Sequence, residues 1–459
     1  MERRFVIYTD FLSQMLLKNK KWGCILYCLC AIYGALFNHE KAIANTAPEF
    51  PIESLETAFK ELDDAARLNG VVLIGVRDKI KFVRANGVKS VDPRHRLLQE
   101  DQFLLGSFTQ QFTAVALLRA LYKKHHSIFQ SVGQVLSQIK ADLHSPISKF
   151  LPPEHKIWNG KPPAWSHEVT LHHLLTHTSG TPDYTTAKAF YGISKLNKQK
   201  YYEQAHTTSE LLELILKLPL AFKAGERYQY SNTNYLILSE VITAITGRDF
   251  GEYLEQLFQT LKMEKTHTLR NGRLSEVAAL PCCSNLVTAL HYDSTGRDKV
   301  LLLNPYAIDL SNTKGVANII SNADDLFKWN IHLHVKLNIL PLSVYRLFTA
   351  NYDSKQDSDG YGYATTVQIT KYGELQGLQG RLGSYSSAVL YLPKSQTSII
   401  LLSNVVYNES KLKHLARKLW IQHKKRKNYT KARAIEETIE RYPDIKGFGA
   451  LWEVISNIR

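Results

Sequence analysis

Apolar side chains recur along this chain at spacings that separate expected helices from expected strands. Residues 103–121, FLLGSFTQQFTAVALLRAL, open with an apolar approach and the pair Gly106-Ser107, and then continue with apolar residues and good helix formers without proline, which predicts a buried helix. Ser107 lies near the start of that helix, where its own N–H and the helix dipole stabilise negative charge beside its hydroxyl. An ordinary N-cap serine occupies the same place. The stretch alone therefore leaves a nucleophile and a helix cap as alternatives.

Short apolar runs predict strands on both sides of the helical middle of the chain. Residues 71–76 and 80–83 flank a polar turn and predict a hairpin, which follows a helical pattern at 55–66. Residues 388–393 and 398–404 predict two more strands. In an α+β arrangement such N- and C-terminal segments build one sheet, and we expect that arrangement here.

The first 44 residues have the layout of an export signal. Their basic side chains precede an uncharged apolar run at 22–37, and Ala42 and Ala44 offer a small-residue cleavage site. That run is short for a transmembrane helix, which needs roughly 20 apolar residues. A cleaved signal peptide is the first interpretation and an uncleaved anchor the alternative. Both predict an exported protein that is periplasmic or membrane-anchored facing the periplasm.

Cysteine usage and net charge narrow the class of protein. Three of the five cysteines lie in the apolar run, which leaves only the adjacent pair Cys282 and Cys283, so neither a disulfide framework nor metal-ligand spacing is present. No metal or cofactor is expected. The net charge of +15 comes without a zinc-finger, helix-turn-helix or RNA-binding signature, so no nucleic-acid partner is expected either.

A basic run at 424–427 opens a helical C-terminal extension, residues 426–459. Such a run is usually a solvated face, and contact with an anionic membrane surface is the alternative interpretation.

The stretch at 103–121 resembles the active-site helix of the serine β-lactamase and penicillin-binding-protein-like hydrolases, in particular their class C-like branch. The family signature there is S-x-x-K, whereas this chain has Ser107 and Gln110, so a glutamine replaces the lysine. Residues 142–152 and 169–180 (VTLHHLLTHTSG) are similar to two further blocks of the family. The resemblance makes the three histidines of the second block structural, and no complete ligand set accompanies them.

The second motif of the family, Y-x-N, is present as Tyr230 and Asn232. By resemblance, Tyr230 is the catalytic partner of Ser107, and Asn232 donates to the substrate amide. A tyrosine has an ordinary pKa of about 10 and acts as a base only if nearby cations lower it. The family supplies that charge from the S-x-x-K lysine and from a Lys or His on the third motif.

The third motif resembles H-x-G, with Gly380 kept and Leu378 at the position of the cation. Strand alternation points Arg381 away from Leu378, although its N–H, with that of Ser107, forms the oxyanion hole by resemblance. Residues 315–329 resemble another block of the family, where Asn318 adds bulk beside the expected substrate.

The resemblance covers residues 50–425 and implies an antiparallel sheet flanked by helices, with an inserted all-helical domain. Ser107, Tyr230 and Gly380, the last on an edge strand, are expected to converge on one site. Two functions remain open. One is an impaired homologue that binds a peptide, ester or cell-wall-derived small molecule. The other is an active serine esterase or D-amino-acid peptidase with a compensating cation, such as Arg381 or a histidine.

Overall fold

The computed structural model describes residues 69–91, 94–185, 201–292, 300–302, 308–352, 360–370 and 373–406. The predicted export signal, the helix at 55–66 and the basic extension at 426–459 lie outside these residues. All described residues belong to one compact unit, 51–459. Within them, no helix is both long and apolar enough to cross a bilayer.

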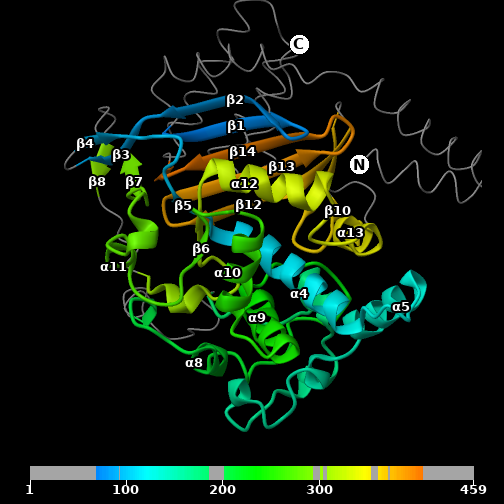
Figure 1. Cartoon of the computed structure of the whole chain (residues 1–459). Helices are drawn as coiled ribbons and strands as arrows, with labels where there is room; N and C mark the ends of the chain where they lie inside the picture. The colour runs from blue at the N-terminus through cyan, green and yellow to red at the C-terminus, as the bar shows by residue number, and fades with distance from the viewer. Residues whose placement is uncertain are drawn as a thin grey trace, which may run out of the picture. The chain divides into compact units, whose positions relative to one another are not determined.

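A seven-stranded antiparallel sheet joins N-terminal and C-terminal segments of the described residues (Figure 1). Its strands, in spatial order, are β10 (Gly360–Tyr361), β11 (Thr366–Thr370), β12 (Gly373–Leu382), β13 (Tyr385–Leu392), β14 (Thr397–Ser403), β1 (Gly70–Val76) and β2 (Lys79–Asn86). The predicted hairpin is confirmed, since Leu73 pairs with Val83 across β1 and β2. Leu73 also pairs with Ile400 of β14, which confirms that distant segments build one sheet.

One face of the sheet is covered by α12 (Ala323–Asn330), which packs on β1 and β14. The approach is close because Gly75 has no side chain: a Cβ there would lie 2.2 Å from a ring carbon of Phe327. Residues of β1 are buried on both faces of the sheet, which explains their nearly uninterrupted apolar sequence.

An all-helical region is inserted between β5 (Phe103–Leu104) and β6 (His267–Thr268), as expected. Its helices are α4 (Thr109–His125), α5 (Val132–Leu143), α6 (Leu171–Leu175), α8 (Thr208–Glu213), α9 (Asn232–Thr246) and α10 (Phe250–Thr260). Short 3-10 turns join them, among them η1 (Gly106–Phe108), η2 (Ile147–Lys149), η3 (Lys156–Trp158) and η4 (Ala164–His167). Figure 1 shows α4 running from the sheet into this region, beside α9 and α10.

The remaining elements are short. They are α11 (Leu274–Val277), α13 (Leu342–Thr349), the 3-10 turns η5 (Pro281–Cys283) and η6 (Leu310–Thr313), the π-helical turn η7 (Ile331–Val335), and the strands β3 (Val88–Val91), β4 (Arg94–Arg96), β7 (Leu290–Tyr292), β8 (Val300–Leu302), β9 (Ile319–Ser321) and β15 (Val405–Val406). β9 pairs with both β5 and β6 in a small second sheet, which closes the helical insertion at its base.

Aromatic packing explains why α4 is apolar around most of its circumference. The ring of Phe112 meets Phe108, Phe258 and Trp329 at centroid distances of 5.3, 5.2 and 4.4 Å. These contacts tie α4 to α10 and α12. The predicted buried helix is therefore confirmed, and it is the central helix between the sheet and the insertion.

The expectation that Gly380 lies on an edge strand is wrong in part. β12 is the third strand of the sheet, because β11 and β10 continue beyond it. β11 pairs with β12 only as far as Gly377, so Leu378–Leu382 pair with β13 alone. The stretch that carries the third motif thus has one unpaired side, although the strand is internal.

Candidate active site

Ser107 lies in the single 3-10 turn that precedes α4, and its hydroxyl caps no helix. The backbone makes a sharp turn just before it, with φ of +58° at Gly106. A Cβ at Gly106 would lie 2.6 Å from the backbone nitrogen of Arg381, so only glycine allows this approach of η1 to β12. The turn therefore holds Ser107 beside β12, and the N-cap alternative does not describe its hydroxyl.

The hydroxyls of Ser107 and Tyr230 meet, as expected from the sequence. The phenol oxygen of Tyr230 lies 3.0 Å from Ser107 Oγ and 3.0 Å from Asn232 Oδ1. Gln110 Nε2 donates to the same phenol oxygen at 2.5 Å and is 3.5 Å from Asn232 Oδ1. Gln110 is fully buried one turn from Ser107. The glutamine therefore makes the contact with the tyrosine that the resemblance assigns to a lysine.

His177 fixes the orientation of the Gln110 amide. Its Nδ1 accepts the backbone N–H of Ser231 at 3.2 Å and the side-chain amide of Asn234 at 3.1 Å. The ring proton therefore resides on Nε2, which donates to Gln110 Oε1 at 3.2 Å. Because that oxygen is engaged by the histidine, the amide nitrogen must face Tyr230. The family resemblance predicts only a structural role for His177, and no sequence pattern predicts this coupling to the site.

No cation compensates for the missing lysine among the groups that contact these hydroxyls in the described chain. Complete burial lowers the pKa of His177 to about 3, so the ring is neutral near pH 7. Although 38% of the Tyr230 surface is exposed, its phenol oxygen faces the buried amide of Gln110. Desolvation, with a contribution from Asp183, raises the pKa of Tyr230 to about 12, and this outweighs its hydrogen bonds with Ser107 and Gln110. The shift is opposite to the one that general-base catalysis requires.

Asp183 is a site residue that the sequence reasoning missed. Its Oδ2 accepts the backbone N–H of Asn232 at 3.1 Å and the side-chain amide of Asn232 at 3.0 Å. That amide also donates to Thr185 at 3.1 Å. The donors of Asn232, expected to face a substrate amide, are thus directed at Asp183 and Thr185. Asp183 follows the block at 169–180 by three residues, but a lone acidic residue in a loop has no pattern that singles it out.

The third-motif positions lie where the alternation of β12 predicts. Leu378 is buried in the apolar core, and Arg381 is exposed on the opposite face of the strand. A Cβ at Gly380 would lie 2.1 Å from the carbonyl oxygen of Leu105 and 2.5 Å from the backbone nitrogen of Phe108. Gly380 is therefore needed for the contact between β12 and η1. Arg381 contributes its backbone to this contact, beside Gly106.

The other two histidines of the block at 169–180 bind within the protein. His172 Nδ1 lies 2.8 Å from the hydroxyl of Tyr363, and His173 Nδ1 accepts the N–H of Thr170 in the capping box of α6. Asn318 is braced in the same way, since its amide bonds the N–H of Gly315 and the carbonyl of Leu269. Across the described ranges, no group of three or more His, Cys, Asp or Glu side chains could hold a metal ion.

A helical domain inserted into an antiparallel sheet, with a serine at the start of the central helix facing a tyrosine, defines a class of penicillin-recognising serine hydrolases and their homologues. Residues 55–424 match the sequence model described as Beta-lactamase, and the chain belongs to that family.

Two curated relatives are similar over most of their length. The "Penicillin-binding protein 4*" of Bacillus subtilis (strain 168) is 23% identical over 354 residues, covering 76% of this chain and 71% of the relative. The "Teichoic acid D-alanine hydrolase" of Staphylococcus aureus is 24% identical over 402 residues, covering 84% of each chain.

Solved structures show the same fold. A penicillin binding protein from Bacillus halodurans has a TM-score of 0.59 at 20% identity, covering 76% of this chain and 95% of its own. A D-stereospecific amidohydrolase from Streptomyces sp. has a TM-score of 0.58 at 21% identity, covering 78% and 95%. The predicted β-lactamase/transpeptidase-like α+β fold is confirmed.

Proposed function

We propose that this protein is a catalytically impaired serine hydrolase homologue that binds a peptide, an ester or a cell-wall-derived small molecule at Ser107. One observation carries the proposal: the neutral amide of Gln110, fixed by the neutral ring of His177, contacts Tyr230 where the family places an ammonium group. By their names, one of the relatives reported above is a teichoic acid D-alanine hydrolase and one structural neighbour is a D-stereospecific amidohydrolase, which supports a ligand of that general kind.

The electrostatics explain why acylation of Ser107 is expected to be slow. With a pKa of about 12, Tyr230 is deprotonated in roughly one molecule in 10⁵ at pH 7. Loss of a general base typically costs about 10²- to 10⁴-fold in rate. The uncharged Leu378 at the third motif adds to the loss, because no second cation lowers the pKa of Tyr230.

Carbonyl binding does not need the missing base. The backbone of Arg381 lies against Gly106, next to Ser107, which supports an oxyanion hole formed by the N–H groups of Ser107 and Arg381.

We assign the protein to the class C-like branch on its Y-x-N motif and its third-motif glycine. From the layout of residues 1–44 we place it outside the inner membrane, periplasmic or anchored there, with the basic extension at 426–459 as a surface for anionic lipid.

The test is covalent labelling of Ser107 by a fluorophosphonate or penicillin probe, with the Ser107→Ala variant as the blank. We expect labelling at least about 10²-fold slower than that of a relative with an intact S-x-x-K motif. The second part of the proposal, ligand binding at this site, is tested separately by titrating ester and D-alanyl-D-alanine-type ligands into the Ser107→Ala variant. Labelling at a rate comparable to the intact relative would refute the proposal.

The alternative is an active esterase or D-amino-acid peptidase with a compensating cation. The aligned hydroxyls of Ser107 and Tyr230 favour it, because their spacing suits proton transfer. Two observations oppose this alternative. The exposed side chain of Arg381 projects from the face of β12 opposite to Leu378, and His177 is neutral, so neither residue supplies the compensating cation. Turnover of a small ester that Ser107→Ala abolishes would select this alternative.

A further inference from the structure

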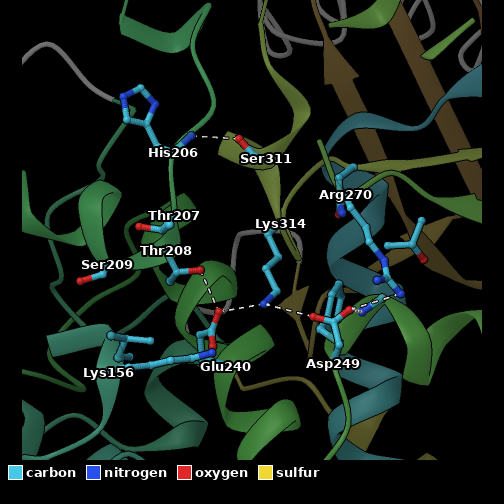
Figure 2. Close-up of a pocket in the computed structure, with 15 residues that line it drawn as sticks. Lys156, His206, Thr207, Thr208, Ser209, Glu240, Asp249, Arg270, Ser311 and Lys314 are labelled. Atoms are coloured by element: carbon cyan, nitrogen blue, oxygen red, sulfur yellow. Dashed lines mark hydrogen bonds and ion pairs between the residues drawn. The ribbon is translucent and has the colours of Figure 1, made fainter. Parts of the chain in front are cut away.

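A cavity of about 420 Å³ lies on the helical region, among α8, α9, the start of α10 and the segment that leads to β9 (Figure 2). Neither Ser107 nor Tyr230 is part of its lining. Glu240 lines it from the middle of α9, eight residues beyond Asn232, which corresponds to about 12 Å along the helix. The cavity is therefore separate from the Ser107 site.

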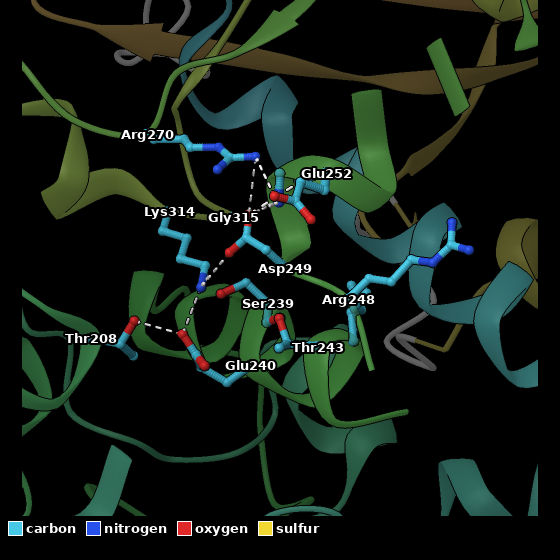
Figure 3. Close-up of polar contacts among 12 residues, drawn as sticks. Thr208, Ser239, Glu240, Thr243, Arg248, Asp249, Glu252, Arg270, Lys314 and Gly315 are labelled. Carbon is cyan, nitrogen blue, oxygen red and sulfur yellow. Dashed lines mark hydrogen bonds and ion pairs between the residues drawn. The ribbon is translucent and has the colours of Figure 1, made fainter. Parts of the chain in front are cut away.

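A buried carboxylate with spare hydrogen-bonding capacity lies in this cavity. The Glu240 side chain is only 3% exposed, and its Oε1 accepts from Thr208 Oγ1 at 2.7 Å and from Lys314 Nζ at 2.8 Å (Figure 3). Within the described part of the chain, no hydrogen bond engages its other oxygen, Oε2, and this oxygen is not among the fully buried atoms without a partner, so it retains access to solvent. Because both oxygens of an ionised carboxylate accept hydrogen bonds, Oε2 is available to a hydrogen-bond donor from a ligand.

The opposite side of the cavity has a similar arrangement around Asp249. One carboxylate oxygen of Asp249 caps α10, and the other is held loosely, 3.8 Å from Lys314 Nζ. Arg270 lies 3.8 Å from Asp249 and 3.2 Å from Glu252. Figure 3 shows these groups connected by hydrogen bonds and ion pairs from Thr208 to Arg270.

The cations of the lining outnumber the carboxylates by one. Lys156, Arg270 and Lys314 stand against Glu240 and Asp249. Lys156 is exposed on η3 and takes part in no ion pair of the described residues. A simple anion would meet two carboxylates here, and a simple cation would meet three positive groups, so each is only partly complemented.

We propose that this cavity binds a small zwitterion of the amino-acid or dipeptide class. The ligand's ammonium group would bond Glu240 Oε2, and its carboxylate would pair with Lys156. Ile157 and Phe250, both buried, are the large apolar residues of the lining. The cavity volume lies in the range of small-molecule sites, which is about 300–1,000 Å³. The site does not depend on the chemistry at Ser107.

Titration calorimetry of the full chain with alanine and alanylalanine, each as the L and D forms, tests the proposal. We expect saturable binding of at least one of them. Acetylation of its amino group should weaken binding by about tenfold or more, and amidation of its carboxylate should also weaken it. Glucose serves as the uncharged comparison, because it offers hydroxyl donors without a zwitterion.

The location of the bound ligand is tested with matched variants. Lys156→Ala removes an exposed lysine of the cavity, and Lys161→Ala removes an exposed lysine five positions away that does not line it. We expect the first to weaken binding by several-fold and the second to leave it unchanged. Glu240→Gln should abolish detectable binding. If that variant does not fold, the comparison of Lys156→Ala with Lys161→Ala decides whether the ligand binds in this cavity.

Three results would overturn the proposal. The first is the absence of binding by any of these compounds up to about 10 mM. The second is binding of glucose or of the acetylated ligand as tight as that of the free zwitterion. The third is zwitterion binding that Lys156→Ala leaves unchanged, which would place the ligand elsewhere, including at Ser107.

Discussion

Gln110 is surrounded by groups that fit an amide better than an ammonium ion. His177 points an N–H at it, whereas Tyr230 and Asn232 offer it oxygen atoms. An amide satisfies both kinds of neighbour, since it carries an acceptor and donors on one planar group. A lysine satisfies only the oxygens and leaves the N–H of His177 without an acceptor. The replacement is therefore integrated into the surrounding hydrogen bonds.

We predict that Gln110→Lys partly restores the reactivity of Ser107. An ammonium group about 4–6 Å from the phenol typically lowers a pKa by 1–3 units. Probe labelling of this variant should therefore exceed that of the wild type and rise with pH. The gain is limited by the unpartnered N–H of His177 and by the cost of burying a charge.

Leu378→His added to Gln110→Lys should label faster still, because it places a second titratable nitrogen on the third motif. Gln110→Met is the matched control, since it keeps the length of the side chain without charge or amide. If both lysine variants fold and label no faster than the wild type, the impairment does not originate at position 110.

Features that follow from a local apolar pattern could be predicted from the sequence. Features that depend on contacts between distant elements could not. The hairpin at 71–83 and the buried helix that follows Ser107 are predicted by apolar patterns, and the structure confirms both, with α4 beginning at Thr109. β10 and β11 were missed because they are short and rich in Gly, Tyr and Thr, with little apolar alternation. Their place beside β12 depends on pairing between strands, which a local pattern does not report.

The candidate site was foreseen to the extent that motifs define it. Ser107, Gln110, Tyr230 and Gly380 come together as the resemblance implies. The functions of His177 and Asp183 could not be predicted in the same way. Each acts through a hydrogen bond to a residue more than 45 positions away, and that distance in sequence hides the contact.

Asp142, at the end of α5, links three elements of the helical region. Its buried carboxylate bonds Lys124 and His125 of α4 at 2.9 and 2.8 Å, and Lys149 of η2 at 2.7 Å. These hydrogen bonds outweigh desolvation and lower the pKa of Asp142 to about 2. The carboxylate thus holds the end of α4 and the block at 142–152 together.

We predict that Asp142→Asn lowers the free energy of unfolding by about 1–3 kcal/mol, because it leaves buried donors with a weaker acceptor. Asp78→Asn, in the exposed turn of the β1–β2 hairpin, is the matched control and should change it by less than about 0.5 kcal/mol. Urea denaturation at neutral pH measures both. Equal midpoints for the two variants would contradict the assigned role of Asp142.

Buried neutral histidines are expected to make the entire fold sensitive to acid. Desolvation lowers the pKa of His172 to about 4, and of His177 and His334 to about 3. An unfolded histidine has a pKa of about 6.5, so on acidification the unfolded chain takes up these protons before the folded chain does. Stability should therefore fall as the pH drops from 6.5 toward 3.

We predict a loss of about 2 kcal/mol of unfolding free energy for each fully buried neutral histidine between pH 7 and pH 5. His334 offers the test, because it lies on η7, where its ring stacks on Tyr391 and bonds the hydroxyl of Tyr345. His334→Gln should be less stable than the wild type at pH 7 but lose less stability on moving to pH 5. A wild-type chain equally stable at both pH values would contradict the prediction.

The pairing of β1 with β14 determines when the main sheet can form during synthesis. Leu73 and Ile400 are neighbours in the sheet but 327 positions apart in the sequence, so β1 lacks one of its two partner strands until the ribosome has made nearly the whole unit. Contacts this distant form slowly, because a long loop must close before they contribute. The nascent chain is thus expected to lack its completed sheet until late in synthesis, and an unfinished sheet is compatible with passage through a translocation pore that admits unfolded chains.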